Sequence, residues 1–208
     1  MAASVPLPPD DEPGQHRPGL RERKKLRTRT AIREAAYRLI DEQGYETTTV
    51  EQIAAAAEVS PSTVFRYFPV KEDIVLADEF GPLVAAAVRA RPAGEPPLEA
   101  VRAVLREAVG TILADRPEES ARRGRLLLEI PAVRARMTET MAETSLPLAR
   151  AVADRTGREE SDLEVLVFTA SVLAALREVT LHWAGHGRKD DPAALVDRAL
   201  DTLRDGLN

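Results

Sequence analysis

The feature that most constrains this chain is the stretch 47–68, TTTVEQIAAAAEVSPSTVFRYF, which holds two short helix signals almost in contact. Thr48 and Thr49 each begin a capping box, in which a hydroxyl and the side chain three residues later satisfy free amides at a helix start. A helix is therefore predicted from about Val50 to Ala57. Its alanines favour helix and let a neighbouring helix approach closely.

A second helix signal follows after only two residues. Ser60 is a suitable N-cap and Pro61 a suitable first helical residue, so the two helices must cross steeply, as in a helix-turn-helix. Val64, Phe65 and Phe68 fall at the spacing of a buried face. The other side carries residues that suit phosphates and base edges, namely Pro61, Ser62, Thr63, Arg66 and Tyr67.

The stretch from about Arg23 to Leu83 holds a series of short motifs: Gly44-Tyr45 after the first helix, Thr48-Thr49-Val50, Ile53-Ala54, Val59-Ser60, Thr63 to Phe68, and Lys71-Glu72. With these motifs the sequence resembles the TetR-type transcriptional regulators. Two positions depart from the family pattern. Glu58 stands where a turn glycine is usual, and Val70 where a serine often caps the fourth helix. Each departure is expected to lower stability by ~1 kcal/mol and to leave DNA contacts intact.

The sequence predicts an all-α protein, because aromatic residues are only 4% and no run alternates apolar and polar residues as a strand requires. An N-terminal three-helix helix-turn-helix DNA-binding domain is expected to precede a C-terminal helical ligand-binding and dimerisation domain. The expected boundaries are a disordered extension at 1–20, the DNA-binding domain at 21–70, a linker helix at 71–91, and the ligand-binding and dimerisation domain at 92–208.

Charge is distributed unevenly along the chain. The net charge is −5, yet residues 17–71 hold eleven Lys or Arg against seven Asp or Glu, which predicts a basic DNA-facing end on an acidic body. The absence of Cys fits a cytoplasmic protein, and no apolar run approaches the ~20 residues of a membrane span. No catalytic constellation is recognisable, so neither an enzyme nor a cofactor is predicted.

Basic residues between Arg21 and Arg29 are expected to form a flexible arm that lies along phosphates or reaches a minor groove. A merely solvated basic helix start is the alternative. The second helix of the helix-turn-helix, which starts at Pro61, is the recognition helix. Lys71 follows it and is expected to contact a phosphate. The predicted DNA contacts are Arg27, Thr48, Thr49, Ser60, Pro61, Ser62, Thr63, Arg66, Tyr67 and Lys71.

In the C-terminal domain amphipathic helices are predicted at 98–114, 117–130 and 131–156, followed by one that ends near 185 and one that starts near 192. Gly81-Pro82 should kink or end the linker helix, and Pro147 should kink or break the third of these helices near Thr144. The helix ending near 185 is apolar on two sides and should lie between two partners. The resemblance implies a homodimer, with an interface assigned to Val172, Leu176, Leu195, Val196, Ala199, Leu200 and Leu203.

The resemblance further implies double-stranded operator DNA and a small-molecule effector as partners. An adaptable apolar pocket is expected from Leu105, Val109, Leu127, Met137, Met141, Phe168, Val172, Arg177 and Trp183. Arg177 has three interpretations: an anchor for a ligand carboxylate or phosphate, a cation paired with a carboxylate across the dimer, or a side chain that snorkels to solvent. Glu178, His182 and His186 recur every four residues, but an exposed polar edge is favoured over a metal site. A metal-responsive regulator and an all-helical adaptor or enzyme are the alternatives.

Overall fold

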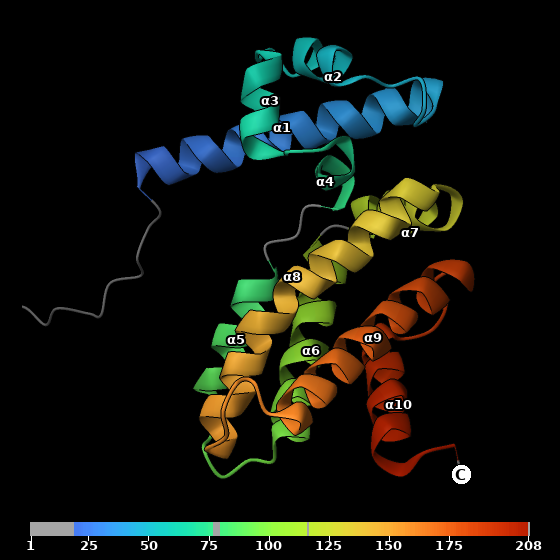
Figure 1. Cartoon of the computed structure of the whole chain (residues 1–208). Coiled ribbons are helices and arrows are strands. Elements are labelled where there is room, and N and C mark those ends of the chain that lie inside the picture. Colours follow the sequence, from blue (N-terminus) through green and yellow to red (C-terminus); the bar gives the residue numbers. More distant parts are fainter. Residues whose placement is uncertain (1–18, 77–79, 116, 208) are drawn as a thin grey trace, which may run out of the picture.

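The computed structural model describes residues 19–76, 80–115 and 117–207, and the regular structure within them is entirely α-helical (Figure 1). Nearly all of the predicted disordered extension lies outside these ranges. The helices are α1 Leu20–Gln43, α2 Val50–Ala56, α3 Pro61–Tyr67, α4 Lys71–Leu76, α5 Phe80–Ala90, α6 Pro97–Asp115, α7 Pro117–Glu129, α8 Pro131–Thr156, α9 Leu163–Gly185 and α10 Pro192–Asp205.

Helices α1 to α4 form an N-terminal lobe, with α2 and α3 packed across α1 (Figure 1). Of the two predicted capping boxes at the start of α2, the one at Thr49 forms and the one at Thr48 does not. The Thr49 hydroxyl accepts from the Gln52 amide at 3.2 Å, and the Gln52 side chain accepts from the Thr49 amide at 2.9 Å. Ser60 caps α3, whose first residue is Pro61. The lobe core gathers residues of all four helices, including Ile32, Ala36, Ile53, Val64, Phe68 and Ile74.

Phe65 was predicted to belong to this core, and that prediction is wrong because its side chain is 48% exposed. Val64 and Phe68 are fully buried and occupy the space facing α1 and α2. A seven-residue helix has only a narrow buried face, so Phe65, one position beyond Val64, turns away from it.

The turn between α2 and α3 requires a left-handed backbone. Glu58 adopts φ 55°, a conformation that favours glycine. Its amide still donates to the Ala55 carbonyl at 3.2 Å, and the Val59 amide donates to the Ala54 carbonyl at 3.0 Å, so the turn is fully formed despite the side chain. The strain predicted from the family comparison is therefore present at this position.

Replacing Glu58 by glycine is expected to raise the free energy of unfolding by up to ~1 kcal/mol, because the left-handed conformation costs an L side chain more than it costs glycine. Urea unfolding followed by circular dichroism measures the change. Glu58→Ala is the matched control, since it removes the same charge but keeps the Cβ. An equal gain in both variants would assign the effect to charge and not to the backbone.

The two proline predictions have different outcomes. The linker helix predicted over 71–91 is two helices, because α4 ends at Leu76 and α5 begins at Phe80, and Gly81 and Pro82 lie in the first turn of α5. A proline is tolerated there because first-turn amides have no helical partner. The break predicted near Thr144 is wrong, because α8 continues through Pro147 and the buried residues that follow it pack the helix against α5 and α9.

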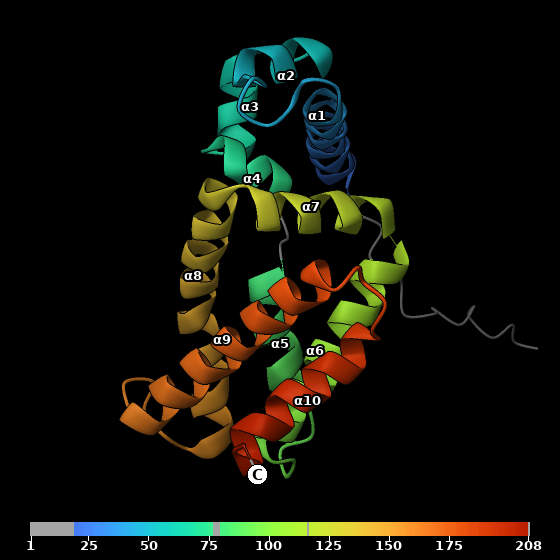
Figure 2. The same ribbon diagram turned by 90° about the vertical axis from the view of Figure 1, so that its right-hand side faces the viewer.

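Helices α5 to α10 form a helical body beneath the lobe, and α7 lies across its top (Figure 2). The body core is built from α5, α6, α8, α9 and α10. Helix α10 packs on α6 and α9, and Arg102 of α6 fastens it with ion pairs to Asp197 at 3.3 Å and Asp201 at 2.8 Å. The apolar stripe of α10 is therefore used inside the protomer.

This packing corrects most of the predicted dimer interface. Leu200 is 1% exposed in the single chain, and Val172, Leu195 and Val196 are buried with it, so these four side chains cannot meet a partner. Leu176 and Ala199 are half-buried, and Leu203 is exposed. The amphipathic pattern of α10 showed that it needs a covering surface but not that α6 of the same protomer provides it.

The other apolar side of α9 faces outward. Leu163 is 71% and Val167 54% exposed, and Leu166 is exposed between them. By length and composition alone, α9 is apolar enough to cross a membrane, which reflects apolar residues on both its faces. One face is buried in the body, and the second is a continuous apolar surface open to a partner.

Candidate DNA-binding surface and ligand pocket

The outer side of α3 presents the residues predicted to contact DNA. Pro61, Ser62 and Arg66 are exposed, and Thr63 and Tyr67 are half-buried. The Arg66 guanidinium lies 5.4 Å from the centroid of the Tyr67 ring, which holds it at the surface. The Ser60 hydroxyl binds the hydroxyls of Ser62 and Thr63, each at 2.9 Å. Thr49 is exposed at the start of α2.

One predicted DNA contact, Thr48, is wrong, and a second, Lys71, stays a prediction because its ammonium also binds within the lobe. Thr48 is 1% exposed, and its hydroxyl donates to the Gly44 carbonyl at 2.8 Å. The Lys71 ammonium donates to the carbonyls of Tyr45 at 2.9 Å and Thr48 at 3.1 Å and lies 3.9 Å from the centroid of the Tyr45 ring. Both residues fasten the 44–49 turn to the rest of the lobe. Carbonyls of that turn therefore compete with any phosphate for Lys71.

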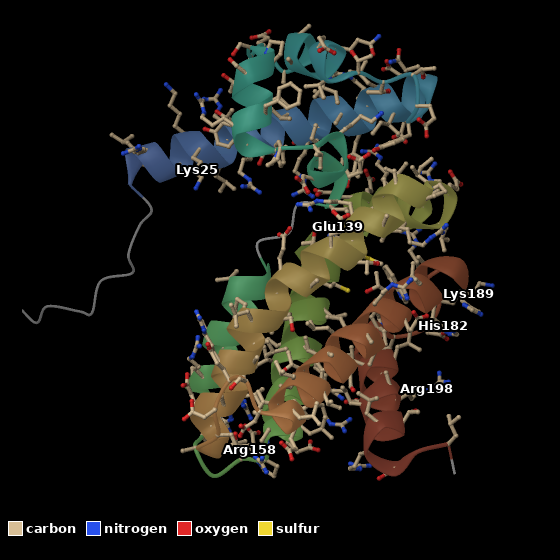
Figure 3. The ribbon with its side chains drawn as sticks, in the orientation of Figure 1. Lys25, Glu139, Arg158, His182, Lys189 and Arg198 are labelled. Atoms are coloured by element: carbon tan, nitrogen blue, oxygen red, sulfur yellow. The ribbon has the colours of Figure 1, made fainter. Side chains whose placement is uncertain are left out.

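The basic segment from Arg21 is a helix and not the flexible arm that was predicted. Helix α1 begins at Leu20, and its first turns extend past α3, with Lys25 labelled there (Figures 1 and 3). Arg23, Lys24, Lys25 and Arg27 are all exposed. The segment therefore carries its cations on a rigid support beside the recognition helix.

The lobe joins the body through a shared apolar core and several polar bonds. Val75 and Leu76 of α4 pack with Leu127 of α7 and Met137 of α8. Ion pairs cross the junction as well, among them Arg136 with Asp73 at 2.7 Å and Arg122 with Asp41 at 2.9 Å. Within the lobe, the Tyr37 hydroxyl of α1 donates to the Val75 carbonyl of α4 at 2.9 Å, and burial, the largest cause, raises the pKa of that phenol.

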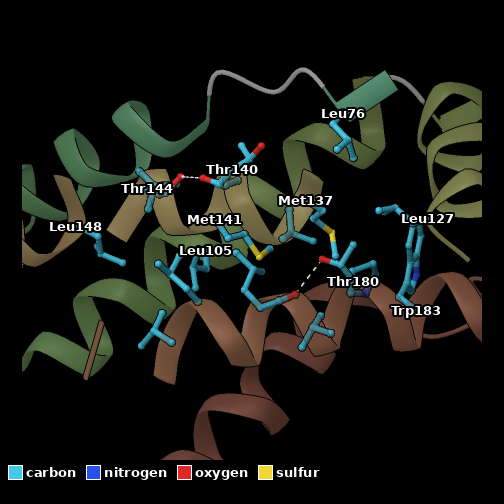
Figure 4. A pocket seen from close by; sticks show the side chains of 18 of the residues that line it. Leu76, Leu105, Leu127, Met137, Thr140, Met141, Thr144, Leu148, Thr180 and Trp183 are labelled. Atoms are coloured by element: carbon cyan, nitrogen blue, oxygen red, sulfur yellow. Dashed lines mark hydrogen bonds between the residues drawn. The ribbon is translucent and has the colours of Figure 1, made fainter. Parts of the chain in front are cut away.

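A pocket of about 230 Å³ lies inside the body, directly below this junction (Figure 4). Leu76 of α4 contributes to its wall, and Leu127 and Trp183 lie at one end with Leu148 at the other (Figure 4). Seven of the residues predicted to bind a ligand line it, namely Leu105, Val109, Leu127, Met137, Met141, Val172 and Trp183. Its surface is overwhelmingly apolar, as in most small-molecule sites.

Phe168 and Arg177 do not line the pocket. Phe168 packs against the body core, and the Arg177 guanidinium pairs with Glu178, its neighbour on α9. The Glu178 carboxylate compensates the Arg177 charge within one protomer, so neither a ligand anchor nor a carboxylate across the dimer is needed to account for that charge. The side chain is 32% exposed, as expected for a snorkelling arginine.

Several lining residues were missed by the sequence reasoning. They include the polar residues Arg123, Thr140, Thr144 and Thr180, together with apolar residues such as Leu76 and Val84. Arg123 follows Arg122 in a helix rich in charge, and nothing in that local pattern separates an inward cation from an outward one. The threonines occur at helical spacing on apolar helix faces, and this was the only available signal.

The row of histidines does not form a metal site. The rings of His182 and His186 stack with centroids 3.9 Å apart, and His186 Nδ1 bonds to the His182 carbonyl at 2.7 Å. Among the residues described, no group of three side chains is arranged to hold a metal ion. Both rings are exposed at the end of α9.

A helix-turn-helix lobe joined to a helical body with an apolar pocket defines a ligand-responsive DNA-binding regulator. Residues 32–77 match the model of the bacterial regulatory proteins of the tetR family, and residues 95–208 match that of the MftR C-terminal domain. Over 200 residues the sequence is 36% identical to the HTH-type transcriptional regulator TcmR of Streptomyces glaucescens, covering 91% of this chain and 88% of TcmR. The chain belongs to the TetR family of transcriptional regulators.

Solved structures agree with this assignment. Thermus thermophilus FadR, a TetR family repressor in complex with lauroyl-CoA, superimposes with a TM-score of 0.52 at 25% identity, covering 86% of this chain and 95% of FadR. NalD of Pseudomonas aeruginosa, the secondary repressor of the MexAB-OprM efflux pump, shares the fold with a TM-score of 0.58 at 22% identity, covering 87% and 97%.

Arg66→Ala is expected to weaken operator binding by about 1 to 3 kcal/mol without lowering the melting temperature, because the guanidinium is exposed on α3. Thr48→Val provides the contrast. It removes a buried hydroxyl that bonds to Gly44 and should lower the melting temperature. Gel shifts and thermal melts of both variants check the two roles. A destabilised Arg66→Ala with unchanged affinity would reverse the assignment of faces.

Proposed function

We propose that this chain is a cytoplasmic repressor that binds a palindromic operator as a homodimer and is released when a lipophilic small molecule enters the pocket. The observation that carries the proposal is the position of Leu76, which belongs to α4 and also forms part of the pocket wall. A ligand in the pocket therefore touches the helix that directly follows the recognition helix.

The contacts of α4 provide a route from pocket to DNA. Its first residue, Lys71, holds the turn before α2, and the Val75 carbonyl near its end accepts from Tyr37 of α1. A ligand that displaces Leu76 thus favours a different position of the whole lobe relative to the body. The change in operator affinity is limited by the ligand's difference in affinity between these two positions. The complexes of FadR with lauroyl-CoA and of Bacillus subtilis FadR with stearoyl-CoA support a lipophilic effector.

A palindromic operator requires two recognition helices at a fixed separation, roughly the 34 Å of one DNA turn. The outward apolar face of α9, with Leu163, Leu166 and Val167, is the surface that best supports dimerisation. Leu203 of α10 is exposed as well and lines the open groove between α9 and α10. Packing the α9 face against its copy about a two-fold axis would cover this face and Leu203 together.

The decisive test is to select bound sequences from a random duplex pool and to screen metabolites for release from the recovered operator. A regulator of this kind should yield an inverted repeat and at least one apolar compound that lowers operator affinity. Binding that shows no sequence preference would refute the operator proposal.

Val167→Arg is expected to give a folded monomer that has lost tight operator binding, because a charge would enter the centre of the proposed interface. Light scattering after size exclusion measures the mass, and circular dichroism checks the fold. Val167→Leu, which keeps the apolar surface, should remain dimeric. Arginine at Leu200 would not test the interface, since that side chain is buried in the protomer and its replacement should unfold the body.

Replacing Lys24, Lys25 and Arg27 by glutamine is expected to flatten the salt dependence of operator binding. Each phosphate that these cations no longer neutralise should reduce the log–log slope by roughly 0.9. The control is Arg158→Gln together with Arg204→Gln, at the end of the body far from the lobe, and it should leave the slope unchanged (Figures 1 and 3). If both sets gave the same slope, the first turns of α1 would be excluded from DNA contact.

A further inference from the structure

The pocket contains one feature that an ordinary apolar cavity lacks. Arg123 of α7 is the sole charged side chain among the described residues that line it. Arg123 precedes Leu127 by one helical turn, so both project from the same side of α7. Arg123 therefore belongs to the end of the pocket at which Leu127 and Trp183 are seen in Figure 4.

Helix α7 is held close to the body at this end. A Cβ at Gly124, the next residue, would stand 3.2 Å from the Cβ of Ala184 on α9, so a larger residue there would force the two helices apart. The close approach of α7 and α9 fixes where the Arg123 side chain starts. Burial, the largest cause, and repulsion by Arg33 lower the pKa of the Arg123 guanidinium, whereas Tyr37 opposes the shift.

The other polar groups of the pocket offer nothing to an anion. The hydroxyls of Thr140, Thr144 and Thr180 donate to the carbonyls one turn earlier, at 3.0, 3.0 and 2.9 Å, which leaves only lone pairs for a ligand. The indole N–H of Trp183 donates to the Asp190 carbonyl at 3.1 Å. Arg123 already interacts within the protein, but a guanidinium carries five N–H groups and can serve a ligand as well.

The neighbouring arginines are paired outside the pocket. At the junction of α1 and α7, Glu119 pairs with Arg33, and Asp41 pairs with Arg122 at 2.9 Å and with Arg125 at 3.9 Å. None of these three arginines lines the pocket, so an anion that enters it meets Arg123 and no other cation among the described lining residues.

The volume limits the size of a ligand. An engineered apolar cavity of roughly 150 Å³ holds the six carbons of benzene, so by proportion about 230 Å³ accommodates roughly nine non-hydrogen atoms, and a longer ligand extends through the open side of the pocket. The methionines at 137 and 141 can adjust to ligands of different outline.

We propose that the effector is an organic anion, a mainly apolar molecule with one carboxylate or similar group that binds Arg123, while its apolar part extends between Leu105 and Met141 toward Leu148. The inference rests on the proposed function only in placing the effector in this pocket. It assigns Arg123 as the residue that selects the charge of the effector. Arg123 lies on α7, the helix that also pairs with α1 through Arg122 and Asp41, so an anion bound to Arg123 would lie next to the junction with the lobe.

The single tryptophan of the chain provides a direct measurement, because Trp183 lines the pocket. Three probes of equal chain length, decanoate, decanol and decyltrimethylammonium, are titrated into the full-length protein, and indole emission and calorimetry give the dissociation constants. Decanoate should bind at least tenfold more tightly than decanol, and the cation most weakly. In Arg123→Met decanoate should lose this advantage, while decanol binds as in the wild type.

Arg125→Met is the matched control, since Arg125 lies on the same helix, pairs with the same junction carboxylate as Arg122, and is exposed outside the pocket. It should keep the preference for decanoate. Arg123→Lys, which keeps the charge, should keep at least part of it. The comparison of decanoate with decanol in the wild type stands even when a variant fails to fold.

Equal affinity of the wild type for decanoate and decanol, failure of all three probes to bind, or a preference that survives in Arg123→Met would each overturn the proposal. Operator binding without probe is measured in the same samples by gel shift. A protein that binds its operator and releases it with an uncharged metabolite would contradict the inference about Arg123 and leave the proposed function standing. A protein without operator binding would contradict the proposed function, whatever the probes do.

Discussion

The structure depends on the burial of three consecutive side chains of α4. Ile74 enters the core of the N-terminal lobe, and Val75 and Leu76 enter the core shared with the body. A helix of six residues has little stability of its own, so its position is set by these two cores and not by its internal hydrogen bonds. The lobe and the body are therefore connected through α4, a short helix whose position depends on its packing against both.

The polar bonds around α4 define its geometry more than they strengthen it. Arg136 meets Asp73 at 2.7 Å, with both side chains mostly buried, and is shared with Glu139 and Glu143, whose attraction solvent screens because these two carboxylates are largely exposed. The bond from Tyr37 to the Val75 carbonyl is buried and fixes the distance between α1 and α4. A few oriented bonds over a modest apolar contact suit the two arrangements of the lobe that the proposed mechanism requires.

Local signals predicted the helix-turn-helix well because its determinants are local. The Thr49 and Ser60 caps and the left-handed Glu58 act within a few residues of their own positions. Long-range packing was less accessible. The sequence does not tell whether Leu200 meets its own α6 or a second chain, nor that Arg123 turns inward while Arg122 pairs with Asp41. Seven of the pocket residues were nevertheless predicted, since apolar side chains on several helices converge in any helical body.

The exposed face of α9 carries a consequence for the amount of regulator a cell needs. If Leu163, Leu166 and Val167 are covered only by a second copy, the fraction of chains able to occupy an operator depends on the concentration of the chain itself. Below the dissociation constant of the dimer, operator occupancy rises with the square of the protomer concentration. Dilution would then open the regulated promoter as effectively as an effector does, and a few-fold change in expression would be amplified at the DNA.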